Sequence, residues 1–437
     1  MTPVDTPRWS PATRIAFRFC FVYFGLYSFA TQIYGGLFII PNFSLPALGT
    51  IWPMRQITSW YATRLFGVTE PLVYTGTSGD TIFYWVQTFW TLLFAAIATA
   101  VWSELDRRRE HYSTLHKWFR LFVRLGLAAQ MFYYGMAKII PTQFRPPSLV
   151  TLVEPVGNLS LTDLLWTFIG ASTPYQVFTG FAELVAGLLL LAPRTTTLGA
   201  TIALLDMIQV FLLNMTYDFG LKQISFHLIL LSVLLLAPDL PRLANLLLLN
   251  RAAGPSTEAP LFRTRRANRI AIVVQLIVGL YLVGVHSHIS WKYWNEEGGP
   301  GGPKSALYGI WDVDQLTIDG VLRSPLNNGD DRDYDRRWRR VIFDTPSTVV
   351  FQRTDDSFAH YGASIDVGTK SLTVTKANSK IWKSRFSFER PAPDQLILDG
   401  EMDGFKIHLQ LQRVELDTFR LLNSGFRWIR PPDPFGG

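Results

Sequence analysis

Hydrophobic residues in the first two thirds of the chain gather in seven blocks, each close to the length of a membrane-spanning helix. A helix needs about 20 mostly apolar residues to cross a bilayer. The blocks are residues 15–40, 81–102, 118–140, 174–192, 198–214, 223–237 and 270–290. The pattern predicts a polytopic α-helical membrane protein of about seven spans. Two shorter aromatic segments, 58–68 and 159–171, are expected at the headgroup level or as a lid over an outward-facing pocket.

After a linker rich in glycine and proline at residues 295–303, the hydrophobic period changes from that of a helix to two. Alternating runs separated by tight-turn sequences occur at residues 338–343, 348–352, 371–375, 385–388, 395–398 and 405–411. Short alternating runs between turn residues are typical of antiparallel strands. The C-terminal part is therefore predicted to be an all-β antiparallel domain that closes into a small barrel.

These changes of pattern divide the chain into four predicted regions. They are N-terminal membrane helices with an outer interfacial loop at residues 1–117, a four-helix membrane bundle at 118–250, a cytoplasmic linker and last membrane helix at 251–294, and the β-barrel domain at 303–437. One set of connecting loops carries 13 Lys or Arg residues and the opposite set carries 4. Because cytoplasmic loops hold the excess of cations, we expect a multi-pass protein of the cell (inner) membrane with a cytoplasmic N-terminus and an extracytoplasmic β domain.

Composition excludes several functional classes. The net charge of +7 comes from cations in membrane loops, so the lipid bilayer and not nucleic acid is the expected partner. The single cysteine, Cys20, excludes a disulfide within one chain and a Cys-based zinc or iron–sulfur site. No nucleotide, metalloprotease or haem-ligand motif is present in a supporting context, so no metal, haem or nucleotide cofactor is predicted.

Four ionisable residues lie in four successive predicted helices: Lys138, Glu183, Asp206 and His227. An ionisable side chain at the centre of a membrane helix costs roughly 2.5–3.5 kcal/mol on insertion scales. Such a residue is therefore expected to face a partner or a wet cavity. We predict that the four converge on one polar site inside the bundle and are its candidate catalytic residues.

Further polar residues extend these positions at helical spacing, which puts them on the same helix faces. Gln130 and Tyr134 precede Lys138 by eight and four residues, and Tyr175 and Thr179 precede Glu183 in the same way. The predicted ligand-binding residues are Gln130, Tyr134, Tyr175, Thr179, Gln209, Asn214 and Gln223.

A structural explanation remains open for each ionisable residue. Lys138 lies near a helix end, where it can extend to the headgroups. His227 can serve only as a hydrogen-bonding group of the bundle. Glu183 and Asp206 lie too deep to reach water, and they can share one proton and hold two helices together.

Residues 118–239 resemble the DoxX/DoxD-like family of integral membrane proteins. The resemblance rests on YYGMAKI at 133–139, on the stretch from 172 to 200 with its Glu inside an apolar helix, on NMTYDFGLKQISFHLILL at 214–231, and on APD at 237–239. It implies a four-helix bundle. Some members of that family are subunits of quinone-linked oxidoreductases, so the resemblance implies a quinone as cofactor.

The β domain opens with Gly309, Ile310 and Trp311, which resemble the G-x-W start of lipocalin-like barrels. A cation commonly packs on that tryptophan, and the Arg427–Trp428 segment is a candidate to supply it. The barrel either holds an apolar ligand or has an interior filled by its own side chains.

Two functions remain open from the sequence, and whether the chain is an enzyme is one difference between them. In the first, the protein is a quinone-interacting subunit of a membrane oxidoreductase, with a proton-handling site in the bundle. In the second, it is a non-enzymatic scaffold, a transport module or a module that binds a lipid or small ligand, and the outer barrel recruits an extracytoplasmic protein partner.

Overall fold

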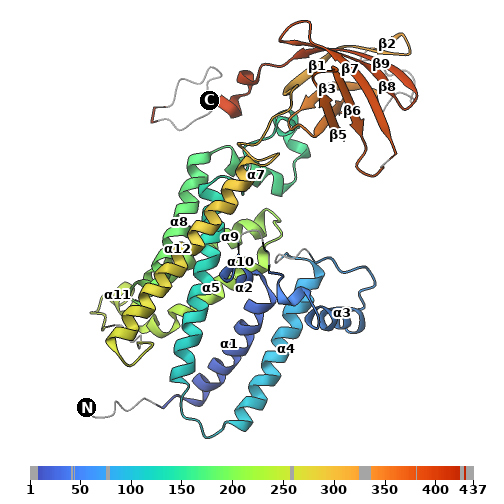
Figure 1. Ribbon diagram of the computed structural model, residues 1–437. Coiled ribbons are helices and arrows are strands. Elements are labelled where there is room, and N and C mark those ends of the chain that lie inside the picture. The colour runs from blue at the N-terminus through green and yellow to red at the C-terminus, as the bar shows by residue number, and fades with distance from the viewer. Residues whose placement is uncertain are drawn as a thin grey trace. The chain divides into compact units, whose positions relative to one another are not determined.

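The structure is a computed structural model that describes residues 8–40, 43, 45–74, 79–255, 260–323, 336–379, 381–423 and 428–429. It divides into two compact units. The helical unit comprises Met1–Ile140 and Val177–Ser290, and the barrel unit comprises Pro141–Gln176 and Trp291–Gly437. Figure 1 shows the helices and strands that make up each unit.

A long helix lies at each of the seven segments that the hydrophobic pattern marks. These helices are α1 (Pro11–Ala30), α4 (Ile82–Leu105), α5 (Ser113–Ile139), α8 (Thr173–Leu191), α9 (Thr196–Thr216), α10 (Lys222–Leu236) and α12 (Arg265–Asn295). Shorter helices are α2 (Gln32–Leu37), α3 (Met54–Arg64) and α11 (Leu240–Leu247). Among the described residues, five helical stretches are long and apolar enough to cross a membrane, and they contain α4, α8, α9, α10 and α12.

The first predicted span is shorter than the sequence suggested. We expected one helix through residue 40, but α1 ends at Ala30 and α2 starts at Gln32. Thr31 between them has an extended backbone with φ −112° and ψ −175°. Its hydroxyl donates a hydrogen bond to the Tyr27 carbonyl at 2.7 Å, which satisfies an end group of α1. Hydrophobicity alone does not reveal this break, because apolar residues such as Phe29 and Ile33 continue on both sides of Thr31 and Gln32.

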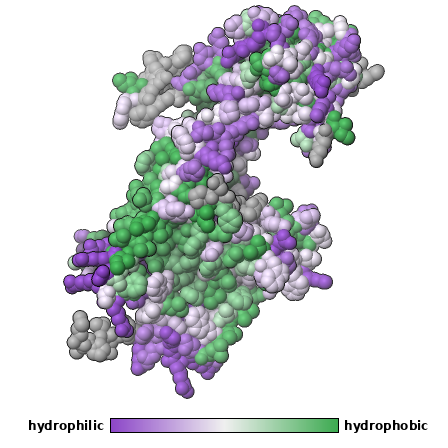
Figure 2. Space-filling view, viewed as in Figure 1, coloured by the Kyte–Doolittle hydropathy of each residue, from purple (hydrophilic) through white to green (hydrophobic). Residues whose placement is uncertain are grey.

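The outside of the helical unit is apolar, as expected for a surface in contact with lipid. Large side chains that are more than half exposed there include Leu205, Ile277, Leu280 and Phe178. Figure 2 shows apolar residues over much of the visible face of this unit, whereas the visible face of the barrel unit is mainly polar. Long apolar helices with an apolar exterior support an integral membrane protein.

The β domain is a closed antiparallel barrel, as the period-two pattern predicts. Its strands are β1 (Gly309–Ile318), β2 (Val321–Arg323), β3 (Trp338–Phe343), β4 (Thr348–Arg353), β5 (Phe358–Asp366), β6 (Ser371–Thr375), β7 (Lys383–Glu389), β8 (Gln395–Met402) and β9 (Phe405–Arg413). β1 pairs with β3, and each strand from β3 to β8 pairs with the next one. β1 also pairs with β9, which closes a ring of eight strands. The short β2 forms a hairpin on β1.

Large apolar side chains fill the barrel interior. Along β7, Phe386 and Phe388 are buried while Arg385 and Ser387 are exposed, so the two faces alternate. The inward side chains pack with Trp311, Trp338 and Phe351, which are all buried, in one hydrophobic core. Alternation of inward and outward side chains is expected along the strands of a closed barrel.

Trp311 lies at the start of β1, as the G-x-W pattern suggests, and its indole Nε1 donates a hydrogen bond to the Leu307 carbonyl at 2.9 Å. The guanidinium of Arg390, after β7, lies 5.6 Å from the Trp311 ring centroid. The predicted cation, Arg427, lies outside the described residues. Arg390 provides a cation for Trp311 from a position that the sequence motif did not indicate.

A segment from before α8 packs on the barrel within the barrel unit. Leu149, at the start of α6 (Leu149–Val153), packs against Ile310, Ile342 and Val350 on the outer side of three strands. The Leu149 backbone N–H donates a hydrogen bond to Asp344 at 3.1 Å. The segment continues through α7 (Leu161–Gly170), which begins with a capping box formed by Ser160 and Asp163. Residues 141–176 are therefore part of the barrel's support.

Candidate functional site

The centre of the candidate site is an ion pair between two neighbouring helices. Lys138 in the last turn of α5 lies 2.5 Å from Glu183 in the middle of α8, measured from Nζ to Oε1. The two side chains are 8% and 2% exposed. Lys138 therefore does not extend to the surface, as one interpretation of the sequence allowed, but is committed to a buried carboxylate.

Two glycines allow the helices to approach closely at this pair. A Cβ on Gly135 would lie 3.0 Å from the Gly180 carbonyl oxygen. A Cβ on Gly180 would lie 2.7 Å from the Gly135 carbonyl oxygen and 2.8 Å from Lys138 Cβ. Small residues at such crossings are common in membrane helix packing. The glycines bring the backbones of α5 and α8 close enough for Lys138 to reach Glu183.

Asp206 on α9 adds a second carboxylate to the pair. Its charge interacts with that of Lys138, and it also acts on Glu183. Among the described residues, Glu183 Oε2 and Asp206 Oδ2 are buried and accept no hydrogen bond. Buried acceptors of this kind are normally satisfied. We call Lys138, Glu183 and Asp206 the ion-pair cluster, and its two free carboxyl oxygens are positions that can carry a proton or accept a hydrogen bond.

Tyr134 and Gln130 lie on the same side of α5 as Lys138 and contact α2, a connection that the sequence did not predict. The Gln32 side-chain amide donates hydrogen bonds to Gln130 Oε1 at 2.9 Å and to the Tyr134 hydroxyl at 2.8 Å. Lys138 Nζ lies 5.8 Å from the Tyr134 ring centroid. Tyr134 also interacts electrostatically with Glu183. The polar interior therefore continues from the ion pair along α5 for at least two helical turns.

His227 on α10 makes its direct contacts with α1. Its Nε2 lies 2.6 Å from the Tyr23 hydroxyl, and its Nδ1 lies 2.7 Å from the Gln223 carbonyl. The imidazole stacks on Tyr27 with ring centroids 3.6 Å apart and an angle of 8° between planes. Both ring nitrogens are occupied, so His227 forms a second polar centre.

The remaining predicted ligand-binding residues do not gather at the cluster. Asn214 donates hydrogen bonds to the Leu221 carbonyl and to Ser225 at 3.2 and 3.1 Å, so it joins α9 to α10. Gln223 donates to the Tyr84 carbonyl at 3.4 Å. Gln209 is exposed, Thr179 is partly buried on α8, and Tyr175 is exposed in the barrel unit, 5.9 Å from Phe168. Helical spacing identified the polar faces but not which neighbour each residue contacts.

Sequence reasoning missed polar residues of α1 and of the first turns of α5. Tyr23 and Tyr27 are spaced by four residues and both face His227. Arg120 and Arg124 are also spaced by four, and both are buried inside a predicted span. The rule that singled out Lys138 applies equally to these arginines. In the described part of the chain, no group of three or more His, Cys, Asp or Glu residues could hold a metal ion.

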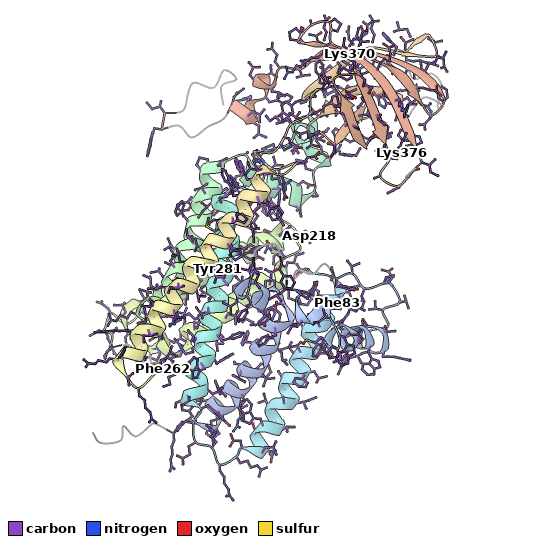
Figure 3. The ribbon with its side chains drawn as sticks, viewed as in Figure 1. Phe83, Asp218, Phe262, Tyr281, Lys370 and Lys376 are labelled. Atoms are coloured by element: carbon purple, nitrogen blue, oxygen red, sulfur yellow. The ribbon has the colours of Figure 1, made fainter. Side chains whose placement is uncertain are left out.

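Figure 3 shows the side chains that occupy the space between the helices, with Tyr281 on α12 among those labelled. Its hydroxyl donates a hydrogen bond to the Ile39 carbonyl at 2.8 Å, so α12 is joined to the segment after α2.

Part of this chain is similar to a known protein. No protein-family model and no solved structure matches the chain. The chain is similar to the Bacillus subtilis protein YwoB, described as uncharacterized, with 37% identity over 116 residues. That match covers 26% of this chain and 73% of the relative.

Proposed function

This chain belongs to the family of the Bacillus subtilis protein YwoB, and we propose that it is a membrane protein that binds a quinone at the ion-pair cluster and exchanges protons with it. The observation that carries the proposal is the pair of buried carboxyl oxygens, Glu183 Oε2 and Asp206 Oδ2, beside the ammonium of Lys138. A quinone oxygen needs a hydrogen-bond donor when oxidised and an acceptor when reduced. The cluster offers both.

Reduction of a quinone would give each residue of the ion-pair cluster a role. Reduction of a quinone to its quinol takes up two electrons and two protons. In this proposal a partner oxidoreductase supplies the electrons. Glu183 and Asp206 deliver the protons, and Lys138 donates a hydrogen bond to the oxygen that gains negative charge. The DoxX-like resemblance supports a quinone as the ligand.

The best test measures quinone retained by the protein after purification in a mild detergent. The expected result is quinone bound to the wild type and at least tenfold less in Glu183→Gln and Asp206→Asn, with unchanged expression. Glu389→Gln, an exposed carboxylate on β7, is the matched control and should retain quinone fully. Wild-type protein without quinone, or a Glu183→Gln variant that retains it, would refute the proposal.

A second candidate function, a scaffold without chemistry, is favoured by the glycine-mediated crossing of α5 and α8 at the same place. In that case the ion pair holds two helices together and the barrel recruits an extracytoplasmic protein. Glu183→Gln then changes stability by about 1–2 kcal/mol, as interhelical hydrogen bonds do, and quinone binding is absent in all variants.

Both candidates place the N-terminus in the cytoplasm and the barrel outside the cell membrane. The cations in alternate loops support this topology. Alkaline phosphatase fused after Gly298 should be active, and the same enzyme fused after Arg109 should be inactive. The reverse pattern would overturn the topology.

A further inference from the structure

A second polar cavity lies in the helical unit where α5 and α12 begin, away from the groups used above. Its volume is about 530 Å³. Residues from α5, from the short turn before α9, from the turn after α10 and from α12 line it. Phe262, labelled in Figure 3, packs on Trp118 beside this end of the unit at a centroid distance of 5.8 Å.

Cationic side chains dominate the lining of this cavity. Lys117, Arg120 and Arg124 follow one another at i, i+3 and i+7 along α5, which places them on one helix face. Arg194 joins them from the turn before α9. The carboxylate in the lining is Asp239, and it is committed to Arg242 at 2.5 Å and to Thr197 at 2.9 Å. The cavity is therefore electropositive.

Two of these cations are buried and held in fixed positions. Arg120 and Arg124 are 9% and 3% exposed. Arg120 Nη1 donates to the Leu235 carbonyl at 2.9 Å. Arg124 donates to Thr196 Oγ1 at 3.1 Å and to Gln275 Oε1. Neutral oxygen atoms thus orient both guanidinium groups, which are well suited to bind the oxygens of a phosphate.

An apolar groove adjoins the basic cavity. Its volume is about 460 Å³, and its lining includes Phe17, Cys20, Phe119, Val123 and Leu234. Trp9, His116, Arg120 and Pro238 line both spaces. The groove follows α1, α5 and α10, which belong to the membrane part of the chain. A single ligand with an anionic head and a hydrocarbon tail would fill both.

We propose that the two spaces together bind one anionic phospholipid, with its phosphate between Arg120 and Arg124 and one acyl chain along the groove. Charge complementarity accounts for the head and apolar lining for the tail. Basic pockets between membrane helices bind anionic lipid headgroups on this principle. A free phosphate would satisfy the cations and leave the groove empty. The inference stands independently of the quinone site, which uses other residues.

The test compares the melting temperature of the full chain in neutral detergent with three additions: phosphatidylglycerol, phosphatidylcholine and inorganic phosphate. Phosphatidylglycerol should raise the melting temperature by several degrees, and the other two should have little effect. An equal shift with phosphatidylcholine would overturn the charge argument. An equal shift with inorganic phosphate would overturn the lipid in favour of a simple anion site.

Three substitutions test which residues bind the phospholipid. Arg194→Gln removes one exposed cation of the lining without touching a buried bond, and it should weaken phosphatidylglycerol binding roughly fivefold. Cys20→Trp fills the groove and should abolish the shift in melting temperature with phosphatidylglycerol. This variant tests the groove without changing the buried Arg120. Arg265→Gln removes an exposed cation at the start of α12 outside the lining and should change nothing. An equal loss in Arg265→Gln, or full binding by Cys20→Trp, would refute the site.

Discussion

The helical unit and the barrel unit place their polar side chains in opposite ways. Among the described residues of the barrel unit, the buried polar side chains are Gln176, Ser305, Gln352 and Ser384, none of which is ionisable. The buried polar side chains of the helical unit include Arg18, Arg120, Arg124, Lys138, Glu183 and His227. The face visible in Figure 2 is reversed as well, since it is largely apolar on the helical unit and mainly polar on the barrel unit.

The difference in where polar side chains lie follows from the surroundings of each unit, water for the barrel and lipid for the helices. It also indicates which unit can hold a reactive site. A barrel in water gains most from an apolar interior, so its core is a packing core. Helices in lipid gain little from burying apolar groups, and polar contacts between them contribute to association. The helical unit therefore concentrates its titratable groups inside, and the candidate sites are found there.

Truncating the barrel core should have the largest effect. Trp311→Ala removes a fully buried indole and should destabilise the barrel unit by about 4 kcal/mol. Ile381→Ala, at an exposed position of the same unit, should have almost no effect. Hydrogen exchange of the full chain measures both units at once. Faster exchange in the strands with unchanged exchange in α8 and α9 is expected, and equal loss in both units would show that the cores are not independent.

Breaking the buried ion pair should come next. Lys138→Met leaves Glu183 buried without its cation and should cost about 3 kcal/mol. The double variant Lys138→Met/Glu183→Gln should recover most of that loss, because the side chain at position 183 no longer carries a charge that needs a cation. Unfolding of the purified protein in a denaturing detergent measures the loss of stability in the single and the double variant.

A partly exposed ion pair provides the control for this cycle. Lys222 and Asp218 lie 2.6 Å apart with side chains 23% and 81% exposed, so Lys222→Met should cost much less than Lys138→Met. A double variant as unstable as Lys138→Met would mean that packing, and not charge, controls the site.

The support of the barrel by α6 should be weaker than its core. Leu149→Ala removes an apolar contact with Ile310 and Val350 and should cost about 2 kcal/mol. Leu161→Ala, exposed on α7 in the same unit, is the control. Thermal melting of the full chain checks the difference. If Leu149→Ala and Leu161→Ala have the same melting temperature, α6 does not stabilise the barrel.

The smallest effect should be a pH dependence at the same contact. Burial raises the pKa of Asp344 above its usual 3.8, although the Leu149 N–H opposes this. A raised pKa means that the group favours folding while protonated and that this contribution is lost as pH rises through the folded-state pKa. Asp344→Asn should therefore melt higher than the wild type at neutral pH, with the gain disappearing in acid.

Asp366 on β5 provides a control of opposite sign. Hydrogen bonds from the Thr369 and Gly368 N–H groups lower its pKa. Its stabilising contribution is present above the usual carboxylate range and is lost as pH falls. Asp366→Asn should melt lower than the wild type at neutral pH. Equal pH profiles for Asp344→Asn and Asp366→Asn would contradict both assignments.

Local pattern was sufficient for much of this architecture. Alternation along segments such as β7 predicted the strands, because a strand exposes alternate side chains to opposite faces. Long apolar runs predicted the helices, and an ionisable residue inside such a run, such as Glu183, could be recognised by its cost in lipid. The barrel closed as expected because pairing of neighbouring strands leaves only its first and last large strands to join.

Only the tertiary structure determined which side chains contact one another. Helical spacing put Lys138 and His227 on inward faces, but Lys138 reached Glu183 where Gly135 and Gly180 let two backbones approach, and His227 stacked on Tyr27. Arg390, far along the chain, packed on Trp311. A side chain's face depends on local geometry and is written in the sequence. Its partner depends on how closely and at what angle distant elements pack, and that geometry exists only in the folded chain.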